Sequence, residues 1–164
     1  MKLCHANQGQ LTFQLADREK VLLLEVLQLY PLVPPAYHQR DGSKRAEDAA
    51  SRKLIEEALT ERRQENKRHL QSLLQNPNRF VQREGDWQFS ITRGDLEWLL
   101  QVLNDVRIGS WIALGSPDPK TTTNVALTPE NAKLFWAMEL CGQFESDLLN
   151  ALHSGEDQDR SPKA

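Results

Sequence analysis

Cysteine is scarce in this chain, which excludes one way of stabilising a small fold. The 164 residues contain only Cys4 and Cys141, which lie far apart and in no metal-like spacing. Small secreted domains that depend on disulfides carry a framework of several pairs, and this sequence cannot form one. We expect two free thiols in a reducing compartment, with a single long-range disulfide as the alternative.

Sequence signatures of catalysis and metal binding are also missing. No Gly-x-Ser-x-Gly, Cys-x-x-Cys, His-x-x-x-His or Glu-x-x-His pattern occurs, and the four histidines are scattered over different predicted elements. We therefore expect no metal, no cofactor and no catalytic nucleophile. The glycine and lysine of residues 115–120 resemble a phosphate loop only faintly, because Pro117 and Pro119 remove backbone donors that would bind phosphate.

Long apolar runs and an excess of positive charge are absent as well. No run approaches the roughly 20 residues that span a bilayer, and the N-terminus lacks the apolar segment of a secretory signal. We therefore expect a cytoplasmic protein without membrane contact. The formal net charge is −3, which argues against nucleic-acid binding, because that binding needs a basic field.

The distribution of apolar residues predicts a mainly α (α+β) fold. Alternating residues predict two small β-hairpins, formed by strands at 2–6 and 11–15 and at 80–83 and 87–91. Helical periodicity predicts four helices, at 17–30, 44–76, 93–114 and 129–153. We expect a four-helix core with one long helix, in a single domain over 1–154, followed by a disordered tail over 155–164. No internal repeat is apparent.

The connector after the first helix contains the motif Pro-Pro-Ala-Tyr at 34–37. This motif matches the Pro-Pro-x-Tyr pattern that aromatic grooves read in a polyproline II conformation. The structural alternative is that the prolines fix the connector and that Tyr37 packs on the core.

The long helix is polar in its middle. Ile55, Leu59, Leu70 and Leu73 share one stripe, but residues 60–69 contain no apolar side chain. Either this part leaves the core, or Arg62 and Asn66 face inward and need partners. Four basic residues share an adjoining face, which forms either a docking patch for an acidic partner or a solvated surface; they are Arg45, Arg52, Arg63 and Lys67.

The third helix contains the strongest candidate site, in the segment LNDVRIGSWIALG (103–115). Asn104 and Arg107 share a face with Trp111, whereas Asp105 points about 100° away. Polar groups buried in an apolar helix need partners. One hypothesis is a structural network in which Asp105 pairs with Arg62. The other is a ligand or partner site lined by Asn104, Arg107 and Trp111.

Small residues predict where the third and fourth helices cross. Gly109 and Ala113 are four residues apart, as are Ala137 and Cys141, and small side chains permit close helix packing. We expect the two helices to meet at these positions.

Several of these segments together resemble an uncharacterised bacterial family of unknown function. They are Pro-Leu-Val-Pro-Pro-Ala-Tyr (31–37), the charged helix with Arg-Lys-Leu (52–54) and Asn-Lys (66–67), and Trp98 followed by Leu-Asn-Asp-x-Arg (103–107). The resemblance covers about 30–115. It implies a helical cytoplasmic protein without established activity, in a family often encoded near the Clp protease adaptor ClpS.

Two functional hypotheses follow. The first is a non-enzymatic interaction or regulatory module, linked through the resemblance to protein turnover. Trp98, Trp111 and Trp136 are more tryptophans than so small a core needs, and exposed tryptophan is typical of interfaces, including that of a homodimer. The second is a binder of a small anionic ligand, or an enzyme of a new type, in which Arg107 binds the anion and Asn104 orients it.

Overall fold

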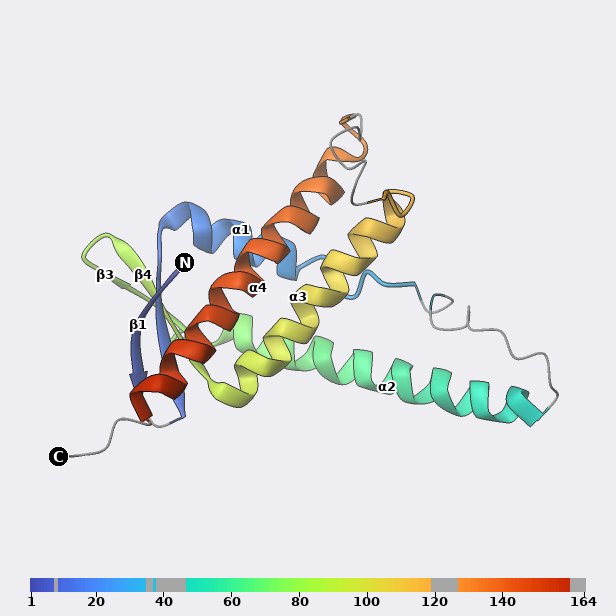
Figure 1. The fold of residues 1–164 in the computed structure, drawn as a ribbon, viewed down its shortest axis with the longest axis horizontal. Coiled ribbons are helices and arrows are strands. Elements are labelled where there is room, and N and C mark those ends of the chain that lie inside the picture. Colours follow the sequence, from blue (N-terminus) through green and yellow to red (C-terminus); the bar gives the residue numbers. More distant parts are fainter. Residues whose placement is uncertain (8, 35–36, 38–46, 119–126, 160–164) are drawn as a thin grey trace.

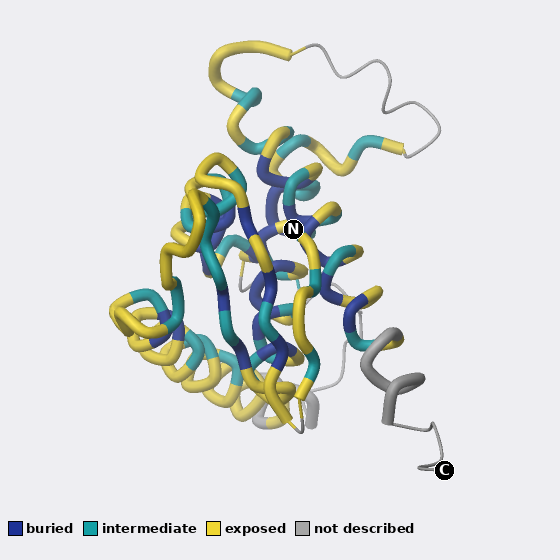
Figure 2. The backbone as a smooth tube through the Cα atoms, turned by 90° about the vertical axis from the view of Figure 1, so that its left-hand side faces the viewer, coloured by how far each residue is buried: buried dark blue, intermediate teal, exposed yellow. Residues whose placement is uncertain are grey.

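The structure of the chain, a computed structural model, describes residues 1–7, 9–34, 37, 47–118 and 127–159. Its elements are β1 (Lys2–Asn7), β2 (Gln10–Leu15), α1 (Asp17–Leu27), α2 (Glu47–Gln75), β3 (Phe80–Arg83), β4 (Asp86–Thr92), α3 (Arg93–Ala113) and α4 (Ala132–Asp159). Helices α1, α3 and α4 lie on one face of the strands (Figure 1), and the described elements leave the other face open (Figure 2).

All four strands belong to one antiparallel sheet, in the order β1-β2-β4-β3. The expectation of two separate small hairpins is therefore wrong. Strands β2 and β4 pair along their whole length, from Gln10 opposite Thr92 to Leu15 opposite Trp87. A two-stranded hairpin is marginally stable alone, whereas the joined sheet offers one continuous apolar face on which the helices pack.

The two hairpins and the helices that follow them form an internal repeat, which corrects our expectation that there is none. Residues 9–27 align with 85–103 without a gap, and identical residues recur 76 positions apart: Gly9/Gly85, Phe13/Phe89, Leu23/Leu99, Leu24/Leu100, Val26/Val102 and Leu27/Leu103. Each apolar pair has the same degree of burial. Phe13 lies opposite its own counterpart Phe89 in the β2–β4 ladder. Self-opposed pairing of this kind is expected on a two-fold axis that relates two ββα units.

The repeat ends where the two helices differ in length. Helix α1 stops at Leu27, and the chain turns away at Tyr30 and Pro31, whereas α3 continues to Ala113. The last turns of α3, from about residue 104, therefore have no helical counterpart in the first half. Helix α4 packs along this longer helix.

Helix α2 enters the core only through its C-terminal half. Leu70 and Leu73 are buried, whereas Leu54 and Ile55 are 67% and 57% exposed. Figure 1 shows the N-terminal end of α2 extending beyond the other helices. The polar middle of α2 follows neither alternative completely. Arg62 is exposed, as expected if this part leaves the core, whereas Asn66 is half-buried and has partners, as expected if it faces inward.

Gly109 packs against the connector and not against α4. A Cβ at this position would lie 2.6 Å from the backbone carbonyl carbon of Leu32. Ala113 is exposed. The helices α3 and α4 do pack together, but the prediction that Gly109 and Ala113 mark their crossing is wrong.

The ends of the chain and its two thiols complete the description. Helix α4 extends to Asp159, past the predicted end at 153, and residues 160–164 lie outside the described part. Cys4 is exposed, Cys141 is buried, and both are free thiols as expected. Among the described helices, none combines the length and the apolar character that crossing a membrane requires.

Candidate functional site

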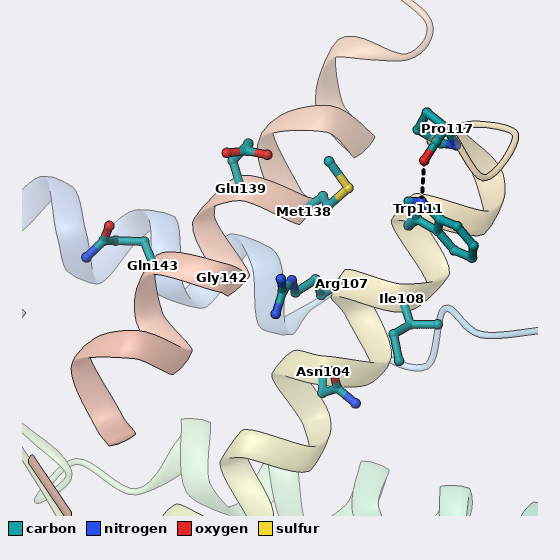
Figure 3. Close-up of a pocket in the computed structure, with 9 residues that line it drawn as sticks. All are labelled: Asn104, Arg107, Ile108, Trp111, Pro117, Met138, Glu139, Gly142 and Gln143. Atoms are coloured by element: carbon teal, nitrogen blue, oxygen red, sulfur yellow. Dashed lines mark hydrogen bonds between the residues drawn. The ribbon is translucent and has the colours of Figure 1, made fainter. Parts of the chain in front are cut away.

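The candidate site is a pocket between α3 and α4, with a volume of about 670 Å³. Four residues of α3 line it from one helical face, at the i, i+3, i+4 and i+7 positions: Asn104, Arg107, Ile108 and Trp111. Helix α4 contributes Met138, Glu139, Gly142 and Gln143, and Pro117 closes one end (Figure 3). The volume lies within the range of about 300–1,000 Å³ that is typical of small-molecule sites.

Arg107 is anchored on one side and open on the other. Its Nη1 donates a hydrogen bond to Glu145 Oε2 at 2.9 Å. The Arg107 side chain is nevertheless 51% exposed, while that of Glu145 is only 10% exposed. A guanidinium carries five N–H donors, so the ion pair fixes the group and leaves donors directed at the pocket.

The Arg107 guanidinium lies beside α4 at Gly142, which has no side chain. A Cβ at this position would lie 3.6 Å from Arg107 Nε and 3.8 Å from Arg107 Cζ. The guanidinium therefore lies against the α4 backbone at this glycine. An alanine at this position would make ordinary van der Waals contact with Arg107, whereas a longer side chain would extend into the space of the guanidinium.

The buried sides of α3 and α4 carry three polar groups near in sequence to this ion pair, Ser110, Cys141 and Glu145. Burial raises the pKa of Glu145, and the bond from Arg107 opposes that shift. Within the described residues, Glu145 Oε1 and the Ser110 hydroxyl have no hydrogen-bond partner. Burial also raises the pKa of Cys141 to about 12, and the charge of Glu145 adds to the shift. The Cys141 thiol is therefore protonated at neutral pH and is not a nucleophile.

The apolar wall of the pocket is held in place by a hydrogen bond. Trp111 Nε1 donates to the carbonyl oxygen of Pro117 at 3.0 Å. The chain reverses here because Gly115 and Ser116 adopt positive φ angles of 87° and 54°. This turn holds the half-buried indole ring at the pocket, which Met138, 9% exposed, also lines.

The polar rim consists of Asn104, Glu139 and Gln143. All three side chains are exposed. The Gln143 amide nitrogen donates to Asp147 at 3.0 Å, which leaves its amide oxygen as an acceptor. Within the part of the chain that the structure describes, Asn104 and Glu139 form no side-chain hydrogen bond or ion pair. The rim therefore offers two amides and one carboxylate beside one guanidinium.

Three other residues predicted for the site lie away from the pocket. Asp105 does not pair with Arg62. Its Oδ1 instead accepts hydrogen bonds from the backbone N–H groups of Leu32 at 2.7 Å and Val33 at 3.2 Å. Arg62 donates to Gln101 at 2.7 Å. The prediction of an Asp105–Arg62 pair is wrong because the partner of Asp105 is the connector backbone.

The connector motif lies partly outside the described residues, since 35 and 36 are not described. The half-buried Tyr37 donates its backbone N–H to the carbonyl oxygen of Pro34 at 3.0 Å. Tyr37 is not among the residues that line the pocket.

The middle of α2 is held by a polar network that the sequence did not specify. Trp98 Nε1 donates to Asn66 Oδ1 at 3.0 Å, and Asn66 Nδ2 donates to Tyr30 at 3.1 Å. The His69 ring stacks on Trp98 at 4.1 Å and contacts Asp95 at 3.1 Å. Partial burial alone would raise the pKa of Asp95, but hydrogen bonds from Thr92 and Arg79 lower it. Trp98 therefore has a structural role.

The basic residues predicted to share one face of α2 have different roles. Arg63 donates to the carbonyl oxygen of Val33 at 2.8 Å and so holds the connector. Lys67 is exposed. Arg45 and the side chain of Arg52 lie outside the described residues, so the predicted patch is not described as a whole.

Comparisons with known proteins do not assign the chain to a family or a function. No model of a known protein family, no curated protein and no solved structure matches this chain. Among the described residues, no group of three or more histidine, cysteine, aspartate or glutamate side chains is placed to hold a metal ion.

Proposed function

We propose that this chain is a non-enzymatic binding module and that its pocket between α3 and α4 takes a small organic ligand through an anionic group. The observation that carries the proposal is the state of Arg107, which is fixed by Glu145 yet half exposed in a pocket of about 670 Å³. A fixed guanidinium binds a carboxylate or phosphate with little loss of conformational freedom. Asn104 lies one turn away and can donate a further hydrogen bond.

The lining favours binding over catalysis. Among the described residues, the lining contains no serine, cysteine, histidine or lysine, and Glu139 is its single titratable group apart from Arg107. Nucleophilic catalysis requires a nucleophile beside a base. The nearby Cys141 thiol is buried and has a raised pKa of about 12.

The test is isothermal titration of the protein with 3-phenylpropionate, a carboxylate on an apolar body. Removing Arg107 alone would leave Glu145 buried without its partner, which destabilises proteins. We therefore use the double variant Arg107→Gln/Glu145→Gln and compare it with Glu145→Gln, which retains the guanidinium.

We expect the wild type and Glu145→Gln to bind, and the double variant to bind at least tenfold more weakly, since a charge-assisted hydrogen bond contributes about 1.5–3 kcal/mol. Equal binding by the folded double variant, or no carboxylate binding by the wild type, would contradict the proposal.

A second candidate function is binding of another protein chain, which is the interaction module that the sequence predicts. Trp136 is 56% exposed on α4 beside Phe135, and exposed tryptophan is enriched at interfaces. We propose self-association as its form, with a link to protein turnover resting on the family resemblance alone. Sedimentation equilibrium of the wild type and Trp136→Ser tests it. A wild type that remains monomeric at high concentration contradicts it.

A further inference from the structure

The charges at the pocket do not suit a purely anionic ligand. Among the described residues of the lining, Arg107 is the only cation and Glu139 the only anion, and Glu145 pairs with Arg107 from beside the lining. A ligand with negative charge alone would bind the guanidinium but would also approach the carboxylate of Glu139. Like charges repel most where solvent is partly excluded. A ligand that also carries a cationic group would meet Glu139 favourably.

The positions of these charges suit two groups carried close together on one molecule. The Arg107 guanidinium lies against Gly142, and Glu139 precedes Gly142 by three residues. Residues three apart on a helix are neighbours, with Cβ atoms about 5–6 Å apart. Figure 3 shows Arg107 extending from α3 toward Gly142, with Glu139 one turn along α4 from that glycine. An ammonium and a carboxylate on the same carbon atom could therefore contact both.

An apolar wall lies beside this pair of charges. Trp111 and Ile108 of α3 and Met138 of α4 are the large apolar side chains of the lining. The hydrogen bond from Trp111 to Pro117 fixes the indole ring. Rigid aromatic and aliphatic surfaces favour an apolar or aromatic substituent on the ligand.

We infer that the pocket recognises a free α-amino acid with an apolar or aromatic side chain. This inference rests on the proposed function. The ligand carboxylate binds Arg107 and Asn104, its ammonium group binds Glu139 and the amide oxygen of Gln143, and its side chain packs against Trp111.

The experiment is isothermal titration of the full chain with three compounds that share one ring. L-phenylalanine carries both charges, 3-phenylpropionate lacks the ammonium group, and 2-phenylethylamine lacks the carboxylate. We expect L-phenylalanine to bind at least about tenfold more tightly than either analogue, because each analogue loses one charge-assisted contact.

Two variants place the effect at the pocket. Glu139→Gln should bind L-phenylalanine only as tightly as 3-phenylpropionate, and it should bind 3-phenylpropionate no more weakly than the wild type does. Glu97→Gln is the matched control, since Glu97 is an exposed acid of α3 outside the lining, and it should bind all three compounds as the wild type does.

The outcomes separate this inference from the proposed function. If the wild type binds 3-phenylpropionate as tightly as L-phenylalanine, the inference fails and the proposed function stands. The inference also fails if Glu139→Gln keeps the full preference for L-phenylalanine. If 2-phenylethylamine binds as tightly as L-phenylalanine, or if no compound with a carboxylate binds, the proposed function itself fails.

Discussion

Replacing Gly109 by alanine should destabilise the protein, because the new methyl group has no space. The added Cβ would lie 2.6 Å from the carbonyl carbon, 2.7 Å from Cβ and 2.8 Å from Cγ of Leu32. Favourable carbon–carbon contacts lie at about 3.5–4.0 Å. Leu32 or α3 must therefore move by about 1 Å.

The backbone of Leu32 is not free to move. Asp105 holds its N–H at 2.7 Å and that of Val33 at 3.2 Å, so a shift would weaken both hydrogen bonds. Overpacking a filled site costs about 1–3 kcal/mol, and each weakened bond adds up to about 1 kcal/mol. Alanine recovers about 0.8–1 kcal/mol of helix propensity. The expected net loss is about 1–3 kcal/mol.

The matched control is Gly94→Ala near the start of the same helix, where an added Cβ has no atom within 4 Å. It should leave stability unchanged or raise it by up to about 1 kcal/mol. Unfolding in urea, followed by tryptophan fluorescence, gives the midpoints at constant slope. A Gly109→Ala protein as stable as Gly94→Ala would refute the close approach of Leu32.

Three further predictions concern groups that touch the site or the connector. Asp105→Ala should lose about 1–3 kcal/mol of stability, because two buried backbone donors lose their acceptor, whereas Arg62→Ala at the exposed face should stay within about 0.5 kcal/mol; urea unfolding compares them. Burial raises the pKa of Glu145 above its ordinary value of 4.5, so the native state binds the proton more tightly than the unfolded chain does. The contribution of this group is therefore present below pH 4.5 and is lost as pH rises through the raised pKa. Glu145→Gln should lack that loss when urea midpoints are measured against pH, and an unchanged profile would exclude it. A thiol reagent at pH 8 should modify the exposed Cys4 rapidly and the buried Cys141 only on unfolding; equal rates would contradict the burial of Cys141.

The local elements of the fold could be predicted from the sequence, but the pairing of the hairpins could not. Alternation of apolar and polar residues identifies a strand and its buried face without naming the neighbouring strand. The partners β2 and β4 are separated by α1 and α2 in the chain. The repeat was missed for a related reason, since its few identities are ordinary core residues until Phe13 is seen opposite Phe89.

Half of the candidate pocket could be predicted, and half could not. Asn104 and Arg107 stand out as polar residues in an apolar helix, and both line the pocket with Trp111. The α4 side was missed, because Glu139 and Gln143 have the pattern of any solvated helix face. Only the packing of α4 on α3 places them opposite Arg107.

The wrong prediction of an Asp105–Arg62 pair has a physical cause as well. Helical periodicity shows which way a side chain points, but it does not identify the partner of an inward carboxylate such as Asp105. The actual donors are two backbone N–H groups of the connector. Backbone donors occur at every residue except proline, so the sequence carries no signal for them.

The central claim, that an anionic group binds Arg107 between α3 and α4, is tested most directly by nuclear magnetic resonance. The protein labelled with ¹⁵N would be titrated with L-phenylalanine and with 3-phenylpropionate. The account predicts saturable shifts of the Arg107 Nε–H, the Trp111 indole N–H and the backbone amides of 138–143. Shifts confined to other parts of the chain, or none at millimolar ligand, would contradict it.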